Sequence, residues 1–140
     1  MEKRKVRLFW GAAIWAAGYG VLNTGYHTLS ENLNKTSEAE LAVLAQGQKL
    51  SENCANCHYL DQRANFVGPH LVDIIGRSSG EVTEFDYSPA LKKLQIRWTR
   101  EQLIEFLQAP QRFAPGTKMA VSGWTAQEAA AIAHYLENRP

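Results

Sequence analysis

The chain has almost no net charge and no strongly basic segment beyond its first few residues. It contains 15 Lys and Arg against 14 Asp and Glu in 140 residues, a formal net charge of +1. Proteins that bind nucleic acid usually carry a clear basic excess, so this class of partner is not indicated. The small total hides a division, because residues 1–7 hold four basic residues and one acidic residue while the remainder is slightly acidic. The basic excess is confined to one end of the chain.

Charged residues are also missing from residues 8–30, and the first part of this stretch is mostly apolar. As a helix, such a stretch spans about 34 Å, compared with about 30 Å of hydrocarbon in a membrane. Basic residues before it keep the N-terminus in the cytoplasm and direct the rest outwards. We predict a signal-anchor at residues 1–29, followed by a polar linker at residues 30–37. A cleaved signal peptide and a buried helix of a soluble domain are the alternatives.

No segment alternates between apolar and polar residues over the length of a strand, and no internal repeat occurs. Four positions instead carry helix-start signals: Ser37, Ser88 before Pro89, Thr99 and Thr125. Pro110 is expected to end the helix that follows Thr99. We predict an all-α domain of four to five short helices with long loops over residues 38–140. Short helices bury little apolar surface, so this domain should need an additional stabilising element in its interior, such as a cross-link or a bound group.

Only two cysteines are present, which excludes a disulfide-rich scaffold. They lie in Cys54-Ala-Asn-Cys57-His58, the signature of covalent haem c attachment. Two thiols three residues apart can each form a thioether with one porphyrin, and the adjacent imidazole can then bind the iron. A disulfide, a thioredoxin-like redox pair and a zinc site are the alternatives, but the chain lacks a βαβ pattern and a second cysteine pair. We therefore predict one covalently attached haem c, with its iron bound by His58.

Methionine is equally scarce. Apart from Met1, the chain contains only Met119, in Pro115-Gly-Thr-Lys-Met119. A thioether in a loop stiffened by proline and glycine is a candidate for the second axial ligand of the iron, although a single methionine can also simply fill a core. The rival ligands are His70, His134 and Lys118. We predict that the metal ligands are His58 and Met119.

Residues 47–136 resemble the class I cytochromes c of the mitochondrial and α-proteobacterial kind. Besides the two motifs that contain His58 and Met119, the resemblance rests on these residues: Gly68-Pro69, Gly76-Arg77-Ser-Ser-Gly80, Tyr87, Trp98 and Tyr135-Leu136. It implies the class I cytochrome c fold, in which short helices wrap around one covalent haem, here after an N-terminal hydrophobic helix.

The resemblance also implies roles for the matching residues. The carbonyl of Pro69 should accept a hydrogen bond from His58 and fix its tautomer. Other cofactor-binding residues should hold the haem propionates: Arg77, Tyr87 and Trp98 at the buried one, and Thr117 near the other. Gly47 and Leu50 on the first helix should cross Tyr135 on the last.

Two positions depart from the family pattern. Leu91 stands where the family commonly has an asparagine near the haem. Phe106 replaces a tyrosine whose hydroxyl usually reaches the methionine sulfur. Because both polar anchors of an internal water network are then missing, we expect a reduction potential that is positive but shifted from that of typical relatives.

Ligation by His58 and Met119 would close both axial positions of the iron and leave no easy route to oxygen activation or substrate binding. We therefore predict an electron carrier and not an enzyme, which passes single electrons between membrane or periplasmic redox complexes. A haem sensor or peroxidase-like protein with a labile Met119 is one alternative. A dedicated electron-accepting subunit of a periplasmic dehydrogenase is another.

The expected partners are membrane redox complexes. The donor would be a quinol:cytochrome c oxidoreductase or a dehydrogenase, and the acceptor a terminal oxidase or reductase, with no nucleic acid or small-molecule substrate. The expected location is the bacterial cytoplasmic membrane, with the haem domain facing the periplasm. Mitochondrial relatives dock through a ring of lysines, but here that ring is thin: the flanking positions are Lys49, Asn53, Gln111, Arg112 and Lys118. Docking is expected to rely on apolar contact around Val121.

Overall fold

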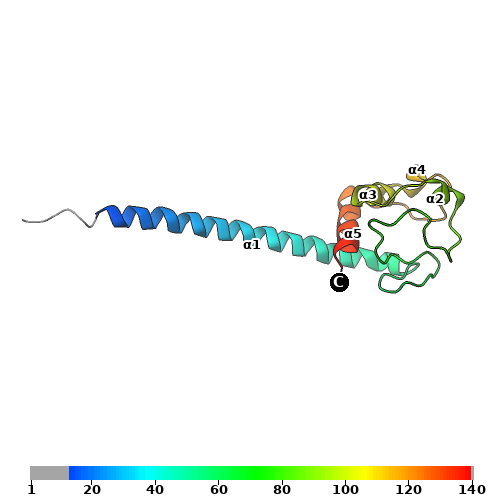
Figure 1. The fold of residues 1–140 in the computed structure, drawn as a ribbon, viewed down its shortest axis with the longest axis horizontal. Coiled ribbons are helices and arrows are strands. Elements are labelled where there is room, and N and C mark those ends of the chain that lie inside the picture. Colours follow the sequence, from blue (N-terminus) through cyan, green and yellow to red (C-terminus); the bar gives the residue numbers. More distant parts are fainter. Residues whose placement is uncertain (1–12, 140) are drawn as a thin grey trace, which may run out of the picture. The chain divides into compact units, whose positions relative to one another are not determined.

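The structure is a computed structural model that describes residues 13–139. Five helices follow one another along this range: α1 (Ala13–Ala55), α2 (Pro89–Lys93), α3 (Arg100–Gln108), α4 (Pro110–Phe113) and α5 (Ala126–Asn138) (Figure 1). In the described residues the only extended pairing is an isolated bridge between Ser78 and Arg97. The predicted all-α architecture is therefore confirmed.

Three of the four predicted helix starts are confirmed by their side-chain caps. Ser88 accepts a hydrogen bond from the backbone N–H of Leu91 at the start of α2. Thr99 and Thr125 each form a complete capping box, in which the N-cap side chain and the side chain three residues later bond reciprocally to the backbone. These boxes satisfy backbone donors that the first turn of a helix would otherwise leave unpaired.

The predicted start at Ser37 is wrong, because α1 runs through it without a break. The Ser37 hydroxyl donates backwards to the carbonyl of Asn34 at 2.8 Å, and the Thr36 hydroxyl donates to Asn32 at 2.9 Å. Hydroxyls that bond to the preceding turn are compatible with a helix interior. Residues 30–37, which the polar sequence suggested as a linker, are accordingly helical.

Pro110 also has a role that the sequence did not predict. The helix after Thr99 ends at Gln108, as expected, but Pro110 then occupies the first turn of α4. Proline is favoured there because the first helical position needs no backbone N–H donor. The short α4 places Phe113 against Trp98, with ring centroids 5.9 Å apart.

Internal contacts divide the chain into a segment that ends at Ala39 and a compact unit that begins at Glu40. Within residues 13–139, no helix is both long and apolar enough to cross a membrane. Residues 1–12 of the predicted signal-anchor lie outside the described residues.

The compact unit has a core in which α3 packs on α5. Its buried members are Ile74, Trp98, Leu103, Phe106, Leu107, Ala114, Ala129, Ile132, Ala133 and Leu136. The C-terminal part of α1 crosses α5 at Gly47, where a Cβ atom would lie 2.1 Å from the carbonyl oxygen of Ala131 and 2.7 Å from Cβ of Tyr135. Only glycine allows this approach, and the crossing expected between Gly47 and Tyr135 is present.

Candidate haem site

A cavity of about 340 Å³ lies inside the compact unit, and every predicted site residue contributes to its lining. These residues are Cys54, Cys57, His58, Pro69, Arg77, Tyr87, Trp98, Thr117 and Met119. They come from the end of α1 and from three separate loop regions. The fold therefore brings together groups that are widely separated in the sequence.

The cavity is bordered by the hydrophobic core itself. Seven core residues line it: Ile74, Trp98, Leu103, Phe106, Leu107, Ile132 and Leu136. Protein interiors are close-packed, and a core that borders a cavity of this size leaves the apolar walls without contact partners. Such walls fit a large apolar ring that is attached to the chain at two points and whose iron is bound by side chains. The residues present thus fit a covalently attached haem.

The Cys-x-x-Cys-His segment continues the last turn of α1. The backbone N–H groups of Cys57 and His58 both donate to the carbonyl of Cys54, at 3.0 and 2.9 Å. The two cysteines form no disulfide with each other, and burial raises the pKa of the Cys54 thiol to about 11 as long as it carries no thioether. Both cysteines line the cavity. No cluster of three or more His, Cys, Asp or Glu side chains suited to a metal ion occurs among the described residues, so the zinc alternative has no support there.

His58 is held by backbone contacts. Its Nδ1 atom lies 2.6 Å from the carbonyl oxygen of Pro69, which is the hydrogen bond that the resemblance predicted. Burial is the main cause that lowers the pKa of His58, which favours the neutral imidazole. When Nδ1 carries the proton and donates it to this carbonyl, Nε2 keeps a free electron pair that can bind a metal.

Gly68 fixes the orientation of the same imidazole. A Cβ atom at this position would lie 2.2 Å from Cε1 and 2.5 Å from Nδ1 of His58, so no other residue fits. The N–H of Gly68 donates to the carbonyl of Cys57 at 2.8 Å, which ties the loop to the haem-attachment segment. The resemblance includes Gly68 in the family pattern but implies no contact for it.

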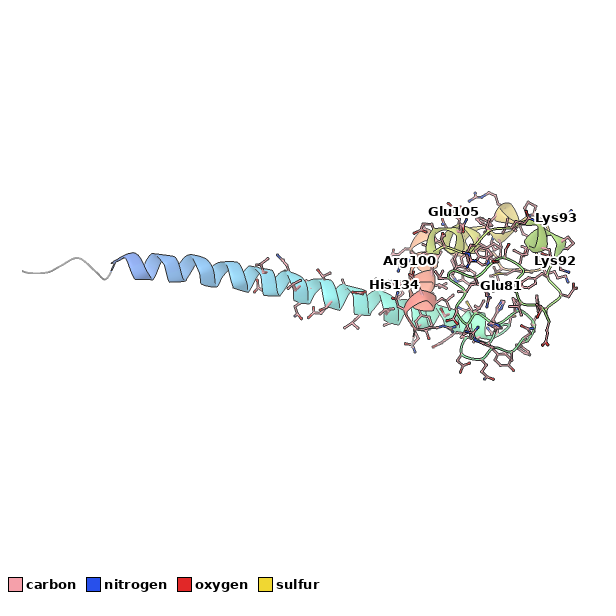
Figure 2. The ribbon with its side chains drawn as sticks, viewed as in Figure 1. Glu81, Lys92, Lys93, Arg100, Glu105 and His134 are labelled. Carbon is pink, nitrogen blue, oxygen red and sulfur yellow. The ribbon has the colours of Figure 1, made fainter. Side chains whose placement is uncertain are left out.

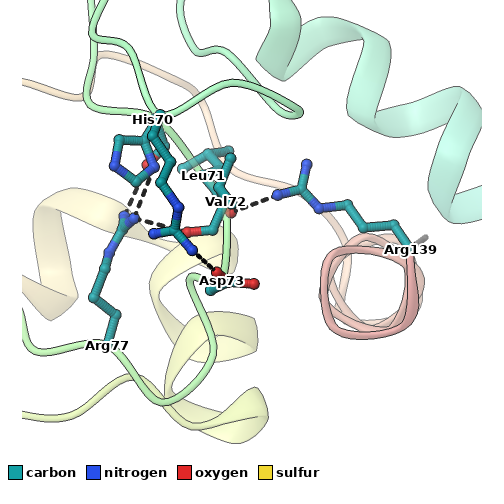
Figure 3. A network of polar contacts seen from close by, with 7 residues as sticks. His70, Leu71, Val72, Asp73, Arg77 and Arg139 are labelled. Atoms are coloured by element: carbon teal, nitrogen blue, oxygen red, sulfur yellow. Dashed lines mark hydrogen bonds and ion pairs between the residues drawn. The ribbon is translucent and has the colours of Figure 1, made fainter.

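Three arginines anchor the loop that follows Pro69 (Figure 3). Arg77 donates to the carbonyls of His70 and Val72, at 2.8 and 3.0 Å, and lies 3.1 Å from Nδ1 of the His70 ring. Arg139 donates to the carbonyl of Leu71 at 3.0 Å, and Arg63 pairs with Asp73. Arg77 therefore both lines the cavity and holds the loop that follows Pro69. The contacts of Arg139 were not foreseen, because nothing in the local sequence near the C-terminus indicates them.

The rival iron ligands are engaged elsewhere. His70 is buried against Arg77 and does not line the cavity. His134 lies on α5 outside the lining, with its Nδ1 atom 3.2 Å from the side-chain nitrogen of Asn138. Lys118 lines the cavity, but its ammonium group donates to the backbone carbonyl and to the carboxylate of Asp86, at 2.9 and 2.7 Å.

Met119 is half-buried and lines the cavity within a braced loop. Gln111 donates to the carbonyl of Thr117 at 2.8 Å and accepts from the N–H of Gly116 at 3.3 Å. Gly116 has a φ of +88°, a conformation that glycine adopts readily. The Thr117 hydroxyl in turn accepts from the N–H of Met119 at 3.3 Å. These bonds hold the backbone from which the Met119 side chain extends.

The remaining predicted residues, Tyr87 and Trp98, are buried aromatic residues of the cavity lining. Tyr87 and Trp98 are each only 6% exposed, and burial raises the pKa of the Tyr87 hydroxyl. Trp98 packs against Phe106, with centroids 5.2 Å apart. Phe106 and Leu91 both line the cavity, so the two departures from the family pattern lie where an added polar group would enter it.

Comparison with known proteins agrees with this geometry. The sequence model of the cytochrome c family matches residues 44–140. Cytochrome c 2.1 of Caenorhabditis briggsae is 44% identical over 94 residues, covering 66% of this chain and 84% of the relative. A cytochrome c homolog of Rickettsia bellii is 40% identical over 92 residues, covering 65% of this chain and 50% of the relative.

A solved structure shows the same fold. Cytochrome cH from Methylobacterium extorquens matches with a TM-score of 0.61 and 34% identity, covering 66% of this chain and 94% of that chain. Proteins of this family bind one covalently attached haem c, to which Cys54 and Cys57 are suited. The chain belongs to the cytochrome c family and has the class I cytochrome c fold.

Proposed function

We propose that this monohaem electron carrier passes single electrons between membrane redox complexes while its N-terminal segment holds it at the bacterial cytoplasmic membrane, with the haem domain in the periplasm. The observation that carries the electron-transfer part is the convergence of Cys54, Cys57, His58 and Met119 on one apolar cavity. A bound haem would supply a one-electron iron couple. The chain's own residues would have to attach the haem, bind its iron and orient the iron ligand.

We assign those residues as follows. Cys54 and Cys57 would tether the haem, and His58 and Met119 would bind its iron. Pro69 and Gly68 keep the His58 imidazole in one tautomer and one orientation. Arg77, Tyr87, Trp98 and Thr117 are the proposed partners of the propionates. Two protein ligands would leave no coordination site for a substrate, which supports a carrier over an enzyme.

The membrane part of the proposal rests on sequence. An uncharged stretch at residues 8–30 follows four basic residues, which is the arrangement of a signal-anchor. A tethered carrier meets neighbouring complexes at a high effective concentration. Mass spectrometry of the native protein tests this: a chain that retains residues 1–29 and stays with the membrane after a high-salt wash supports the anchor. A chain that begins within residues 16–30 supports a cleaved signal peptide.

The electron-transfer part has its own test. Full-length holo-protein should undergo a reversible one-electron redox titration and should not bind imidazole or carbon monoxide at low concentration. Tight binding of such ligands would instead favour the sensor or peroxidase-like alternative, in which Met119 leaves the iron. Co-purification in fixed stoichiometry with a periplasmic dehydrogenase would favour the subunit alternative.

A further inference from the structure

The exposed part of the cavity lining carries almost no charge. Its exposed members, which we call the cavity rim, are Asn53, Val67, Lys118, Ala120 and Val121. A protein that exchanges electrons with a group in the cavity must approach this rim, because electron transfer requires proximity. Lys118 is the only charged side chain in the rim.

That single charge is paired. The Lys118 ammonium group contacts the carboxylate of Asp86 at 2.7 Å and its carbonyl at 2.9 Å. Exposed ion pairs add little to stability, but two opposite charges this close cancel as seen by an approaching molecule. Asp86 also pairs with Lys92 at 3.2 Å. The three side chains together keep one positive charge, and Asp86 makes its shorter contact with Lys118. Lys92 is on α2 and outside the cavity lining (Figure 2).

The rim also contains exposed apolar side chains, and further apolar side chains lie next to it. Val67 is 66% exposed and Val121 is 38% exposed, and both line the cavity. Phe66, next to Val67, is 56% exposed, and its ring lies 5.8 Å from that of Tyr59, which is also exposed. Single exposed apolar residues are normal on a protein surface. Here several adjoin one functional cavity, which is typical of an interaction site.

We infer that Tyr59, Phe66, Val67, Ala120 and Val121, the rim patch, form the docking surface for a redox protein whose own contact face is apolar and uncharged, and that Asp86 keeps Lys118 from recruiting an acidic face. This inference rests on the proposed electron-carrier function. A charged partner face would lose hydration at the rim patch without gaining a counter-charge. An uncharged apolar face avoids this desolvation cost and gains the burial of Phe66 and Val67.

The test uses the full-length holo-protein in its reduced, diamagnetic state, in non-ionic detergent, with two redox-inert paramagnetic probes. Tris(phenanthroline)chromium(III) is a trication with apolar ring faces, and it is used at high ionic strength so that its charge is screened. Hexacyanochromate(III) is a polar trianion and is used at low ionic strength. The readout is the broadening of assigned NMR resonances, which reports binding and not electron transfer. We expect the phenanthroline complex to broaden Val67 and Val121, and the cyanide complex to leave Ala120 and Val121 sharp.

Matched variants separate the effect of charge at the rim from the effect of its apolar side chains. Asp86→Asn should admit hexacyanochromate(III) to the rim at low ionic strength, with broadening of Ala120 at least doubled. Glu105→Gln makes the same change in net charge on α3, outside the lining, and should have no such effect (Figure 2). Val67→Thr should at least halve the broadening by the phenanthroline complex. Val43→Thr, at an exposed valine of α1, should not.

Several results would overturn the inference. Hexacyanochromate(III) at the wild-type rim would show that Lys118 is available to acidic partners. Broadening of the rim patch by phosphatidylcholine vesicles would identify a lipid surface as the occupant, and broadening that grows with protein concentration would identify a second copy of the chain. A redox titration of the same samples tests the electron-carrier function separately, because it does not depend on docking.

Discussion

The carbonyl oxygen of Pro69 lies 2.6 Å from Nδ1 of His58, and the backbone of Gly68 packs directly against the same ring. One short loop thus sets both the tautomer and the orientation of the imidazole. The loop is itself held by arginines from three regions of the chain. The position of the proposed iron ligand is therefore determined by contacts well outside the haem-attachment motif.

Gly68→Ala should displace the His58 ring, because the added Cβ would lie 2.2 Å from Cε1. Overpacking of this kind costs about 1–3 kcal/mol or more. We expect a lower midpoint of thermal unfolding and an altered absorption spectrum of the haem. Gly76→Ala is the control: its Cβ has open space, so it should cost only the strain of a φ of +84° and leave the spectrum unchanged. An unaltered spectrum in Gly68→Ala would contradict the packing.

Ser51→Ala should stabilise the protein. The Ser51 hydroxyl is fully buried and has no hydrogen-bond partner among the described residues. An unpaired buried hydroxyl costs about 1–3 kcal/mol, part of which the substitution recovers. Chemical denaturation of the holo-protein measures the difference in the free energy of unfolding.

Ser88 is the matched control for Ser51, because it is equally buried but caps α2. Ser88→Ala should lose about 1 kcal/mol of stability. If both alanine variants shift the free energy of unfolding in the same direction, the assignment of Ser51 as an unpaired group is wrong.

Phe106→Tyr should change the reduction potential. Phe106 lines the cavity together with Met119, so the new hydroxyl would enter an apolar region and act on the iron's surroundings. A spectroscopic redox titration of the variant beside the wild type measures the shift, and Leu103→Ile offers an apolar control at the same wall. Identical potentials in Phe106→Tyr and wild type would reject the idea that the missing hydroxyl tunes the potential.

Removal of the haem attachment should unfold much of the compact unit. Seven core residues border the cavity, and without a group inside it their apolar surfaces lack contacts. We expect the Cys54→Ser/Cys57→Ser variant to show a large loss of helical circular dichroism and no cooperative thermal transition. A cooperative transition near that of the wild type would mean that the core closes without haem.

Local chemistry made much of this protein predictable from sequence. The caps at Ser88, Thr99 and Thr125 depend on residues three positions apart, and each was found as expected. The spacing of Cys54, Cys57 and His58 is likewise local. The haem type and the fold class followed from these short patterns and from the resemblance to class I cytochromes c.

The errors and omissions arose where the wider extent of an element or a distant contact decides the structure. The pattern at Ser37 has the composition of a capping box, but its hydroxyl bonds to the previous turn because the helix already extends to Ala13. Asp86 gave no signal at all, since its pairing with Lys118 depends on a loop that closes across 32 positions. The bond from Arg139 to Leu71 spans 68 positions and could only be seen in the structure.

The most direct test of the electron-carrier assignment is the absorption spectrum of the oxidised, full-length holo-protein beside that of Met119→Leu. The account predicts a six-coordinate, low-spin wild type with the weak long-wavelength band of an iron–methionine bond, and its complete loss in Met119→Leu, which preserves apolar volume. A five-coordinate wild type, or a spectrum that the substitution leaves unchanged, would contradict ligation by Met119 and with it the closed iron site on which the carrier function depends.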